Sequence, residues 1–595
     1  MKGRPPLARL AFPELAGTAG RMAEAGNRDA AIRLYADWLR HNPRSPSAFA
    51  AHFNSGCLLQ EAARFEEALA AYAACLRANP QFVQTRLNLG NTLDRLGRRD
   101  EAIAEWRKLL AAPVDPALQR IALNNLGLVL EQTGQWGEAI TMLSRSLAID
   151  PQQDEVIYHW VRLRQRICDW PVYAEVPGIT VEQMVSRTSA VAMLSVTDDP
   201  ALQLAAARRN MAGFSTAGLP DLAGPVRFGH ARVRIGYLSS NFNLHAVSML
   251  IAELLELHDR QRVEVFAFSW SPQDGSAMLQ RIRVAVDHFV DITQIPDADA
   301  AQAIRAAEID VLVDLQGLTT NARPRILAHR PAPRQVAWLG HPGTAAVPGV
   351  DYLLADRFLV PEDQQPLYAE QLLYLPDCYQ VNDRQRPRGT PATRAQYGLP
   401  EDAFVFCAFN NTNKFTPEAF AAWMQILRGV PGSLLWLLAD NPEAHRHLLQ
   451  HVADAGMDPA RVVIAHRLPY LEYLARFPLA DVFLDTFPFT GGVTTSDALW
   501  MGLPVVTRAG RSFASRMSGS LLHAMGVPEL VTASFEDYAE LAIDLARNPA
   551  RLQALRETLV RNRETSPLFD TPRLCRHLED LFIGLAGAAP AGGGP

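Results

Sequence analysis

The feature that most constrains the fold of this chain is a pattern that repeats every 34 residues near its N-terminus. Three segments align: NSGCLLQEAARFEEALAAYAACLRANP, NLGNTLDRLGRRDEAIAEWRKLL and NLGLVLEQTGQWGEAITMLSRSLAIDP. Gly56 and Gly90 are 34 residues apart, whereas Gly90 and Gly127 are 37 apart, because three extra residues lie around Pro113 and Pro116. A fixed period of this kind indicates a stack of similar helical units.

Thirty-four residues is the period of the tetratricopeptide repeat (TPR), a pair of antiparallel helices. Small residues recur where the two helices cross, and Pro80 and Pro151 end the second helix of their units. A weaker unit comes first, since Ala31 and Pro43 have the spacing of Ala68 and Pro80. We therefore predict that residues 1–151 form an α-solenoid with a concave binding face.

An asparagine lies two residues before each repeat glycine, at Asn54, Asn88 and Asn125. Amides at one fixed repeat position could hold the backbone of a bound peptide, which makes these three residues candidate acceptor-binding residues. The alternative is that they are solvated or make contacts within their own helix.

The pattern of apolar residues changes after the repeats. Residues 152–230 show helical pattern without the period, and we interpret them as a helical connector. Two series of short apolar runs follow, separated by helix-length segments: VRIGYLSS, VEVFAFSW, IDVLVDLQG and RQVAWLG, then AFVFCAFNN, SLLWLLAD, RVVIAH, DVFLDTFPF and PVVTRAG. Such runs are typical of buried parallel strands in βαβ units.

Two Rossmann-like domains are therefore predicted, at residues 231–395 and 396–585, which makes the fold class α plus α/β. The polar, proline-rich stretch 377–400 is interpreted as the hinge between them, and the Gly/Ala/Pro-rich residues 586–595 as a disordered tail.

Composition excludes several classes of protein. The net charge of −6 argues against a nucleic-acid partner, and no run approaches the roughly 18 apolar residues that span a bilayer. None of the six scattered cysteines pairs at CxxC spacing, so the spacing indicates neither a zinc site nor a disulfide framework. We expect a cytoplasmic protein with reduced thiols.

Polar motifs follow two runs of the second series. A lysine among amides in NNTNK, residues 410–414, suits a diphosphate. In GGVTTSDALW, residues 491–500, glycines and threonines at a helix start could cradle phosphate, and Asp497 could accept from ribose hydroxyls. The alternatives are an exposed loop lysine and an ordinary capped turn.

Histidines follow two runs of the first series, at His245 and in HPGT, residues 341–344. Either could act as a base or donate to a sugar or phosphate oxygen, although a structural histidine is the alternative. The DxD at Asp297–Asp299 is interpreted as a helix N-cap, so neither a metal nor another cofactor is expected.

The TPRs are followed by five distinctive segments: RIGYLSSNFNLHAVS, RPAPRQVAWLGHPGT, FNNTNKFTPEAF, LADVFLDTFPF and TTSDALWMGLPVVT. In this order, and over nearly its whole length, the chain resembles the O-linked N-acetylglucosamine transferase/SPINDLY family. The resemblance implies a GT-B fold and a metal-independent, inverting transfer of N-acetylglucosamine from UDP-GlcNAc to Ser/Thr hydroxyls of proteins held by the repeats. Another donor, such as the GDP-fucose of SPINDLY proteins or a sugar used in flagellin glycosylation, is an alternative. So are a catalytically decayed TPR scaffold and, disfavoured by the repeats, a transferase acting on a glycan or lipid carrier.

The resemblance also implies residue roles. His245 matches the active-site histidine, and Lys414 matches the lysine on the donor diphosphate. Asn411 stands where the animal enzyme has a glutamine near that diphosphate. Leu468, Tyr473 and Arg476 match positions that contact the base, and Val493, Thr494 and Asp497 match the loop that holds phosphate and ribose. The other expected donor-site residues are His341, Gly343, Thr344 and Thr495.

This chain departs from the family pattern at several of these positions. The family's HPT reads His245–Ala246–Val247, its His-Thr-Thr reads Gly492–Val493–Thr494, and its base-stacking histidine reads Tyr473. The GHT of plant SPINDLY reads Gly317–Leu318–Thr319. The fold and the reaction class are unaffected, but the identities of the sugar and nucleotide stay open.

Overall fold

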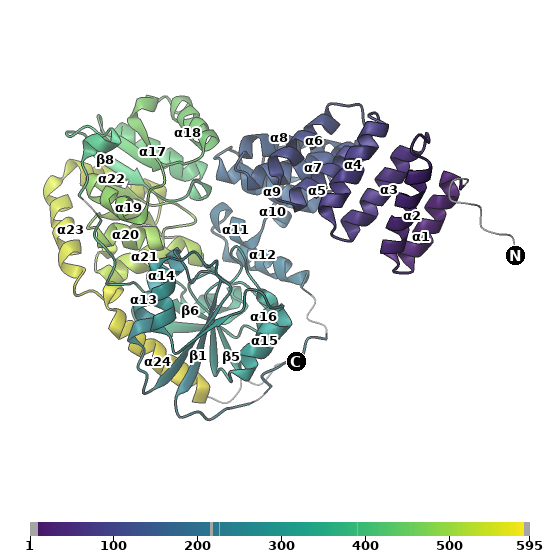
Figure 1. The fold of residues 1–595 in the computed structure, drawn as a ribbon. Helices are drawn as coiled ribbons and strands as arrows, with labels where there is room; N and C mark the ends of the chain where they lie inside the picture. Colours follow the sequence, from purple (N-terminus) through teal and green to yellow (C-terminus); the bar gives the residue numbers. More distant parts are fainter. Residues whose placement is uncertain (1–9, 215–217, 225, 390, 588–595) are drawn as a thin grey trace. The chain divides into compact units, whose positions relative to one another are not determined.

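The chain forms two compact units in the computed structural model, which describes residues 10–214, 218–224, 226–389 and 391–587 (Figure 1). The repeat unit contains the residues up to Arg164 together with Tyr173–Arg187, and the sheet unit contains Gln165–Val172 and the residues from Thr188 onward. Within the described ranges, every helix is too short or too polar to cross a membrane.

The repeat unit consists of consecutive helix pairs, as predicted. The pairs are α1 (Phe12–Glu24) with α2 (Arg28–His41), α3 (Ala48–Glu61) with α4 (Phe65–Ala78), α5 (Gln84–Arg95) with α6 (Arg99–Leu110), and α7 (Pro116–Gln132) with α8 (Trp136–Ile149). Two further helices follow, α9 (Asp154–Arg166) and α10 (Val181–Arg187).

The repeat glycines explain the period. A Cβ atom added at any of them would lie under 3.0 Å from the side chain sixteen residues later, in the pairs Gly56–Tyr72, Gly90–Trp106 and Gly127–Leu143. Only glycine lets the second helix of each unit pack this closely on the first.

The sheet unit contains two wholly parallel sheets, which confirms the predicted pair of Rossmann-like folds. The first has the order β3-β2-β1-β4-β5-β6-β7, and the second has the order β10-β9-β8-β11-β12-β13. The strands of the first sheet are β1 (Val233–Ser239), β2 (Val263–Ser269), β3 (His288–Asp291), β4 (Val311–Asp314), β5 (Arg334–Ala337), β6 (Tyr352–Asp356) and β7 (Gln371–Leu375). Those of the second are β8 (Val405–Ala408), β9 (Leu434–Leu438), β10 (Val462–Ala465), β11 (Val482–Leu484), β12 (Val505–Arg508) and β13 (Val531–Thr532).

Four of these strands were missed by the sequence patterns. β3 has two exposed ends and β13 has only two residues, so neither gives an apolar run. β6 and β7 are apolar, but a short 3₁₀ turn at Glu362–Leu367 separates them in place of the helix-length segment that identified the other strands.

Helices flank both sheets. Before and among the strands of the first sheet lie α11 (Ala190–Val196), α12 (Pro200–Ala212), α13 (Ala246–Leu257), α14 (Ala277–Ala285), α15 (Asp297–Ala306) and α16 (Pro324–Ala328). With the second sheet come α17 (Pro417–Gly429), α18 (Pro442–Asp454), α19 (Tyr470–Arg476), α20 (Val493–Trp500), α21 (Phe513–Met525), α22 (Phe535–Arg547) and α23 (Pro549–Asn562), and the last described helix is α24 (Thr571–Gly587).

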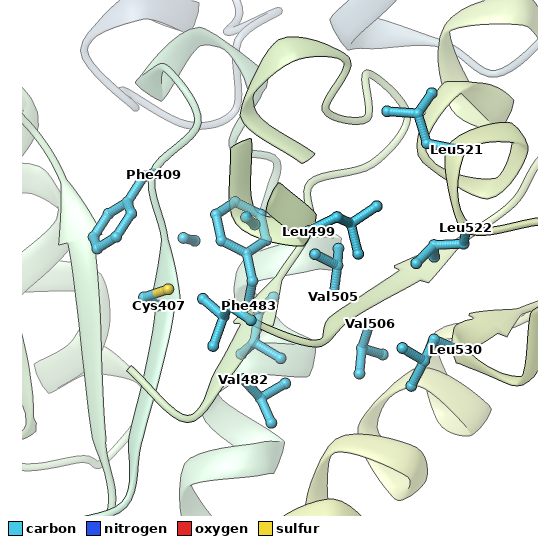
Figure 2. Close-up of a cluster of buried hydrophobic side chains, with 14 of the residues drawn as sticks. Cys407, Phe409, Val482, Phe483, Leu499, Val505, Val506, Leu521, Leu522 and Leu530 are labelled. Atoms are coloured by element: carbon cyan, nitrogen blue, oxygen red, sulfur yellow. The ribbon is translucent and has the colours of Figure 1, made fainter. Parts of the chain in front are cut away.

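The core of the second sheet is continuous with its helices. Figure 2 shows the buried side chains that meet there from β8, β11, β12 and the helices beside them: Cys407, Phe409, Val482, Phe483, Leu499, Val505, Val506, Leu521, Leu522 and Leu530.

The last helix corrects a predicted domain boundary. α24 was assigned to the second Rossmann-like domain, but it packs on β1 and β4 of the first sheet, and Figure 1 shows it beside β1. Leu574, Leu578 and Phe582 join the core that contains Ile235 and Val313. The helix also includes residues 586 and 587 of the predicted tail, whose remaining residues, 588–595, lie outside the described part of the chain.

The prediction that the DxD motif is a helix N-cap is wrong. Asp297 and Asp299 lie in the first turn of α15, whose N-cap is Pro296, and Asp297 pairs with Arg323 at 2.7 Å. They are therefore not N-caps, because the helix starts one residue earlier than the DxD pattern suggested.

The stretch 377–400 is polar for a structural reason. Arg384 pairs with Glu253 of α13, and Arg386 donates to Asp497 of α20 at 2.9 Å in a fully buried ion pair. This segment therefore ties helices of both sheets together through its charges.

Candidate functional site

The predicted site residues of the sheet unit lie in the loops that follow the carboxyl ends of strands and in the helices that those loops open. In open parallel sheets, ligands bind at this edge. The loops after β8 and β11 carry the lysine and the glycine-threonine motif, and those after β1 and β5 carry the two histidines.

Lys414 connects two of the predicted motifs. Its ammonium Nζ donates to the carbonyl oxygen of Thr490 at 2.8 Å and lies 3.7 Å from the centre of the Phe489 ring. Burial lowers the pKa of Lys414 to about 8, and the nearby carboxylate of Asp485 opposes this shift. The lysine after β8 is thus fixed against the loop that leads into α20.

Asp485, at the end of β11, organises this loop and was not singled out from the sequence. Its Oδ1 accepts from the Gly491 backbone N–H at 2.9 Å and from Asn410 Nδ2 at 3.0 Å, and its Oδ2 accepts from the Thr507 hydroxyl at 2.8 Å. A Cβ at Gly491 would clash with the Thr495 hydroxyl. The sequence signal that could have identified Asp485 is its position directly after a buried strand.

α20 begins at Val493, with Gly492 as its N-cap. Val493 packs against the core of the first sheet, and Val493 and Thr494 are half-buried. The helix start is therefore shared by the two sheets, and its free N–H groups favour an anion there.

Thr495 and Asp497 are buried beneath this helix start. The Thr495 hydroxyl lies 2.7 Å from that of Ser518, and Asp497 Oδ1 accepts from Arg386 at 2.9 Å and from the Tyr470 hydroxyl at 3.0 Å. Burial raises the pKa of Asp497 to about 6, while Arg386 opposes the shift. In this arrangement both side chains support the loop, and ribose binding by Asp497 stays a prediction.

The predicted base-contacting residues gather around α19. Leu468 and Tyr473 are half-buried, whereas Arg476 is only 1% exposed and lies behind Tyr473, 5.3 Å from that ring and 4.6 Å from the ring of Phe409. Arg476 Nη1 donates to the backbone carbonyl of His466 at 2.9 Å. Direct contact of Arg476 with a base therefore stays a prediction.

Asn411 lies at the edge of this group. It is exposed, and its Oδ1 accepts from Arg467 at 2.7 Å. The loops after β8 and β10 thus meet at the position predicted to lie near the diphosphate.

His245 is the N-cap of α13. Its Nδ1 accepts from the Val247 backbone N–H at 3.2 Å, and the side chain remains exposed. Partial desolvation by the surrounding protein lowers the pKa of His245, so the ring is neutral at pH 7. With Nδ1 accepting, the neutral ring carries its proton on Nε2, so it can donate from Nε2–H, and it can accept a proton at Nδ1 only when that atom leaves the helix cap.

The HPGT loop is held by a residue that the sequence did not indicate. Glu370 accepts from the Thr344 hydroxyl at 2.6 Å and from the backbone N–H groups of Ala345 and Ala346. Gly343 has a φ of 149°. Thr344 is buried, so its hydroxyl orders the loop in this structure.

His341 is buried in the same loop. Burial lowers the pKa of His341 to about 4, and its Nδ1 has no hydrogen-bond partner among the described residues. The ring is therefore neutral over the physiological range of pH.

The repeat asparagines contact the preceding helices. Asn54 donates to the Tyr35 hydroxyl at 3.1 Å, Asn88 to Cys57 Sγ at 3.4 Å, and Asn125 to Asn91 Oδ1 at 2.7 Å. All three are half-buried. One N–H of each amide thus links neighbouring helices, and peptide binding by the remaining groups stays a prediction.

Comparison with known proteins gives two family matches. The model of glycosyl transferase family 41 matches residues 225–388 and 388–578, and a tetratricopeptide repeat model matches residues 53–116 and 87–154.

Two curated relatives carry closely related names. The chain is 35% identical over 445 residues to a probable UDP-N-acetylglucosamine–peptide N-acetylglucosaminyltransferase, SEC, of Arabidopsis thaliana. The match covers 70% of this chain and 45% of that protein. It is 30% identical over 464 residues to the UDP-N-acetylglucosamine–peptide N-acetylglucosaminyltransferase of Caenorhabditis elegans, covering 59% of this chain and 40% of that protein. The chain thus spans less than half the length of these relatives.

Among solved structures, a mutant of the Thermobaculum terrenum O-GlcNAc transferase is similar, with a TM-score of 0.66 and 28% identity. The likeness covers 90% of this chain and 97% of that one.

Proposed function

The chain belongs to glycosyl transferase family 41, and from this membership we propose that it is a protein O-glycosyltransferase that moves N-acetylglucosamine from UDP-GlcNAc to Ser/Thr hydroxyls. The names of its relatives support the donor and the peptide acceptor. The repeats support an acceptor that is a protein, because stacked helical units offer an extended binding surface.

The observation that carries the proposal is the position of Lys414. Its ammonium is fixed by Thr490 and Phe489 at the loop that opens α20, so a positive charge and helix N–H groups converge on one place. This combination fits a diphosphate, which needs both neutralisation and oriented donors.

The proposed reaction is a single displacement with inversion at the sugar. The acceptor oxygen forms a bond to the anomeric carbon while the bond from that carbon to the diphosphate oxygen breaks. Negative charge develops on the departing nucleoside diphosphate, where Lys414 and the start of α20 would stabilise it.

The acceptor hydroxyl must lose its proton during this displacement. His245 is neutral at pH 7 because desolvation lowers its pKa, so it can hold the hydroxyl in place with its Nε2–H, or take up the proton at Nδ1 once that atom leaves the Val247 N–H. In this proposal neither donor binding nor transfer requires a metal ion, and the protein acts in the cytoplasm, where its six free cysteines stay reduced.

The test is a donor panel of UDP-GlcNAc, UDP-glucose and GDP-fucose, with thermal shift and donor hydrolysis measured in parallel in the presence of EDTA. A ligand that binds only the folded protein raises its melting temperature. We expect UDP-GlcNAc to give the largest shift and the fastest hydrolysis. A response confined to GDP-fucose would replace the proposed donor, and no response to any donor would favour a decayed scaffold.

A further inference from the structure

A buried cluster outside the candidate site brings together three metal-ligating residue types. His258 follows α13, and Cys575 and Glu579 are one turn apart on α24. The three residues are 4%, 3% and 2% exposed, respectively. The two parts of the cluster are more than 300 residues apart in sequence, so the cysteine spacing gave no sign of it.

The three ligand atoms are spaced as the corners of a zinc site. Cys575 Sγ lies 3.6 Å from His258 Nδ1 and 3.5 Å from Glu579 Oε1, and these last two atoms are 3.0 Å apart. Tetrahedral Zn²⁺ with ordinary bond lengths would hold such pairs about 3.5, 3.5 and 3.3 Å apart. The ligand atoms therefore need to move by only a few tenths of an ångström to bind the ion.

The surroundings of the cluster also suit a bound metal. His258 Nε2 lies 2.8 Å from the hydroxyl of buried Tyr237, which would orient the ring through its other nitrogen. Glu579 accepts from the Asp259 backbone N–H at 2.8 Å and pairs with Arg262 at 3.1 Å. Such outer contacts fix the ligands of metal sites.

We propose that His258, Cys575 and Glu579 bind one structural zinc ion that fastens α24 to the end of α13. The mixture of thiolate, imidazole and carboxylate favours zinc over the hard cations calcium and magnesium. One thiolate and one carboxylate balance the charge of Zn²⁺, the thiol proton is released to water, and no electrons are transferred. The three protein ligands leave the fourth tetrahedral position to a water molecule.

This zinc would act on the fold and not on sugar transfer. α13 carries His245 at its first end and His258 at its last, so the ion would hold the helix that presents His245. The inference is independent of the proposed function, because the cluster would bind zinc whichever donor the protein uses.

The test measures metal in full-length, tag-free protein produced in zinc-supplemented medium and freed of loose metal by gel filtration. We expect about one zinc per chain in the wild type, and a severalfold loss in Cys575→Ser. The matched control is Cys378→Ser, which alters another buried thiol, 3.5 Å from the Ser520 hydroxyl, and should keep the zinc. Equal zinc in Cys575→Ser and the wild type would overturn the site.

A second measurement needs no variant. Wild-type protein unfolded with a chelator and refolded with CoCl₂ should show a thiolate-to-cobalt charge-transfer band, which ZnCl₂ should remove. Refolded protein that takes up neither ion would show that the cluster is only hydrogen-bonded, and would overturn the proposal.

Discussion

The repeat unit and the sheet unit differ in how far along the chain their decisive contacts reach. In the repeat unit, each close crossing joins a glycine to a side chain sixteen residues later, as in Gly90 and Trp106. In the sheet unit, Lys414 meets Thr490 across 76 residues, and Arg386 meets Asp497 across 111. Damage to the first unit should therefore appear as lost stability, and damage at the loops of the second as lost chemistry.

Among the changes that would test this difference between the two units, Lys414→Ala is expected to have the largest effect on turnover. Removing the charge that we propose faces the departing diphosphate should lower turnover by about 100- to 1,000-fold, with little change in melting temperature. The control is Lys108→Ala, which removes an exposed lysine of α6 in the repeat unit and should leave turnover unchanged. Steady-state kinetics of both variants check this, and near-wild-type turnover in Lys414→Ala would remove the residue from the mechanism.

Gly90→Ala tests the other side of the comparison. Its Cβ would collide with the Trp106 ring, and overpacking of this kind costs about 1–3 kcal/mol of stability. Gly20→Ala is the matched control, because Gly20 is also within a helix, α1, but its Cβ would have nothing within 4 Å. Denaturant unfolding of the two variants should separate them, and equal stabilities would mean that the period does not mark close packing.

His245→Ala should lower turnover at least about tenfold, since general acid–base groups contribute this much or more. Because His245 also caps α13, His245→Asn is the informative partner: asparagine can cap a helix but is not a base. If the histidine takes part in transfer, both variants lose turnover. If Asn restores it, His245 is a structural cap.

The proposed role of Lys414 predicts how nucleotide binding depends on pH. Its folded-state pKa is about 8, so the ammonium loses its proton as the pH rises through 8. The affinity for UDP should then fall by up to about tenfold for each further pH unit. Calorimetry at pH 7, 8 and 9 measures this, with Lys414→Ala as the pH-insensitive control. A wild-type affinity that is constant from pH 7 to 9 would contradict the role.

The same difference in contact range explains what the sequence could predict. The repeat pattern and the apolar runs record local packing, so the helix pairs and most strands were predictable. The strand-end motifs were also visible, and they carry Lys414, one of only three lysines among 57 basic residues.

What could not be predicted depends on long-range contacts. Nothing near Asp497 in sequence indicates that Arg386 neutralises it, and nothing near Thr344 points to Glu370. Likewise, α24 looks like a continuation of the second domain until its apolar face is seen against β1. Arg476 matched a motif position, yet its burial behind Tyr473 depends on how α19 packs.

The smallest effect on transfer is expected from the repeat asparagines, which would bind the acceptor protein for the sheet unit. Replacing Asn54, Asn88 and Asn125 with Ala should raise the KM for full-length protein acceptors severalfold and leave donor hydrolysis unchanged. The reason is that binding energy lost far from the reacting atoms does not alter the chemical step.

The structure makes this last test sharper, because each of the three amides also donates to a preceding helix. Losing those hydrogen bonds costs about 1 kcal/mol each, so a change in KM could come from a loosened repeat unit. Tyr35→Phe separates the two causes, since it removes the hydroxyl that Asn54 contacts and keeps the amide. If the amides bind acceptor backbone, the triple variant raises KM while Tyr35→Phe, of lowered stability, does not. If both variants raise KM in proportion to their lost stability, the asparagines act only within the repeats, and acceptors must be chosen by another surface.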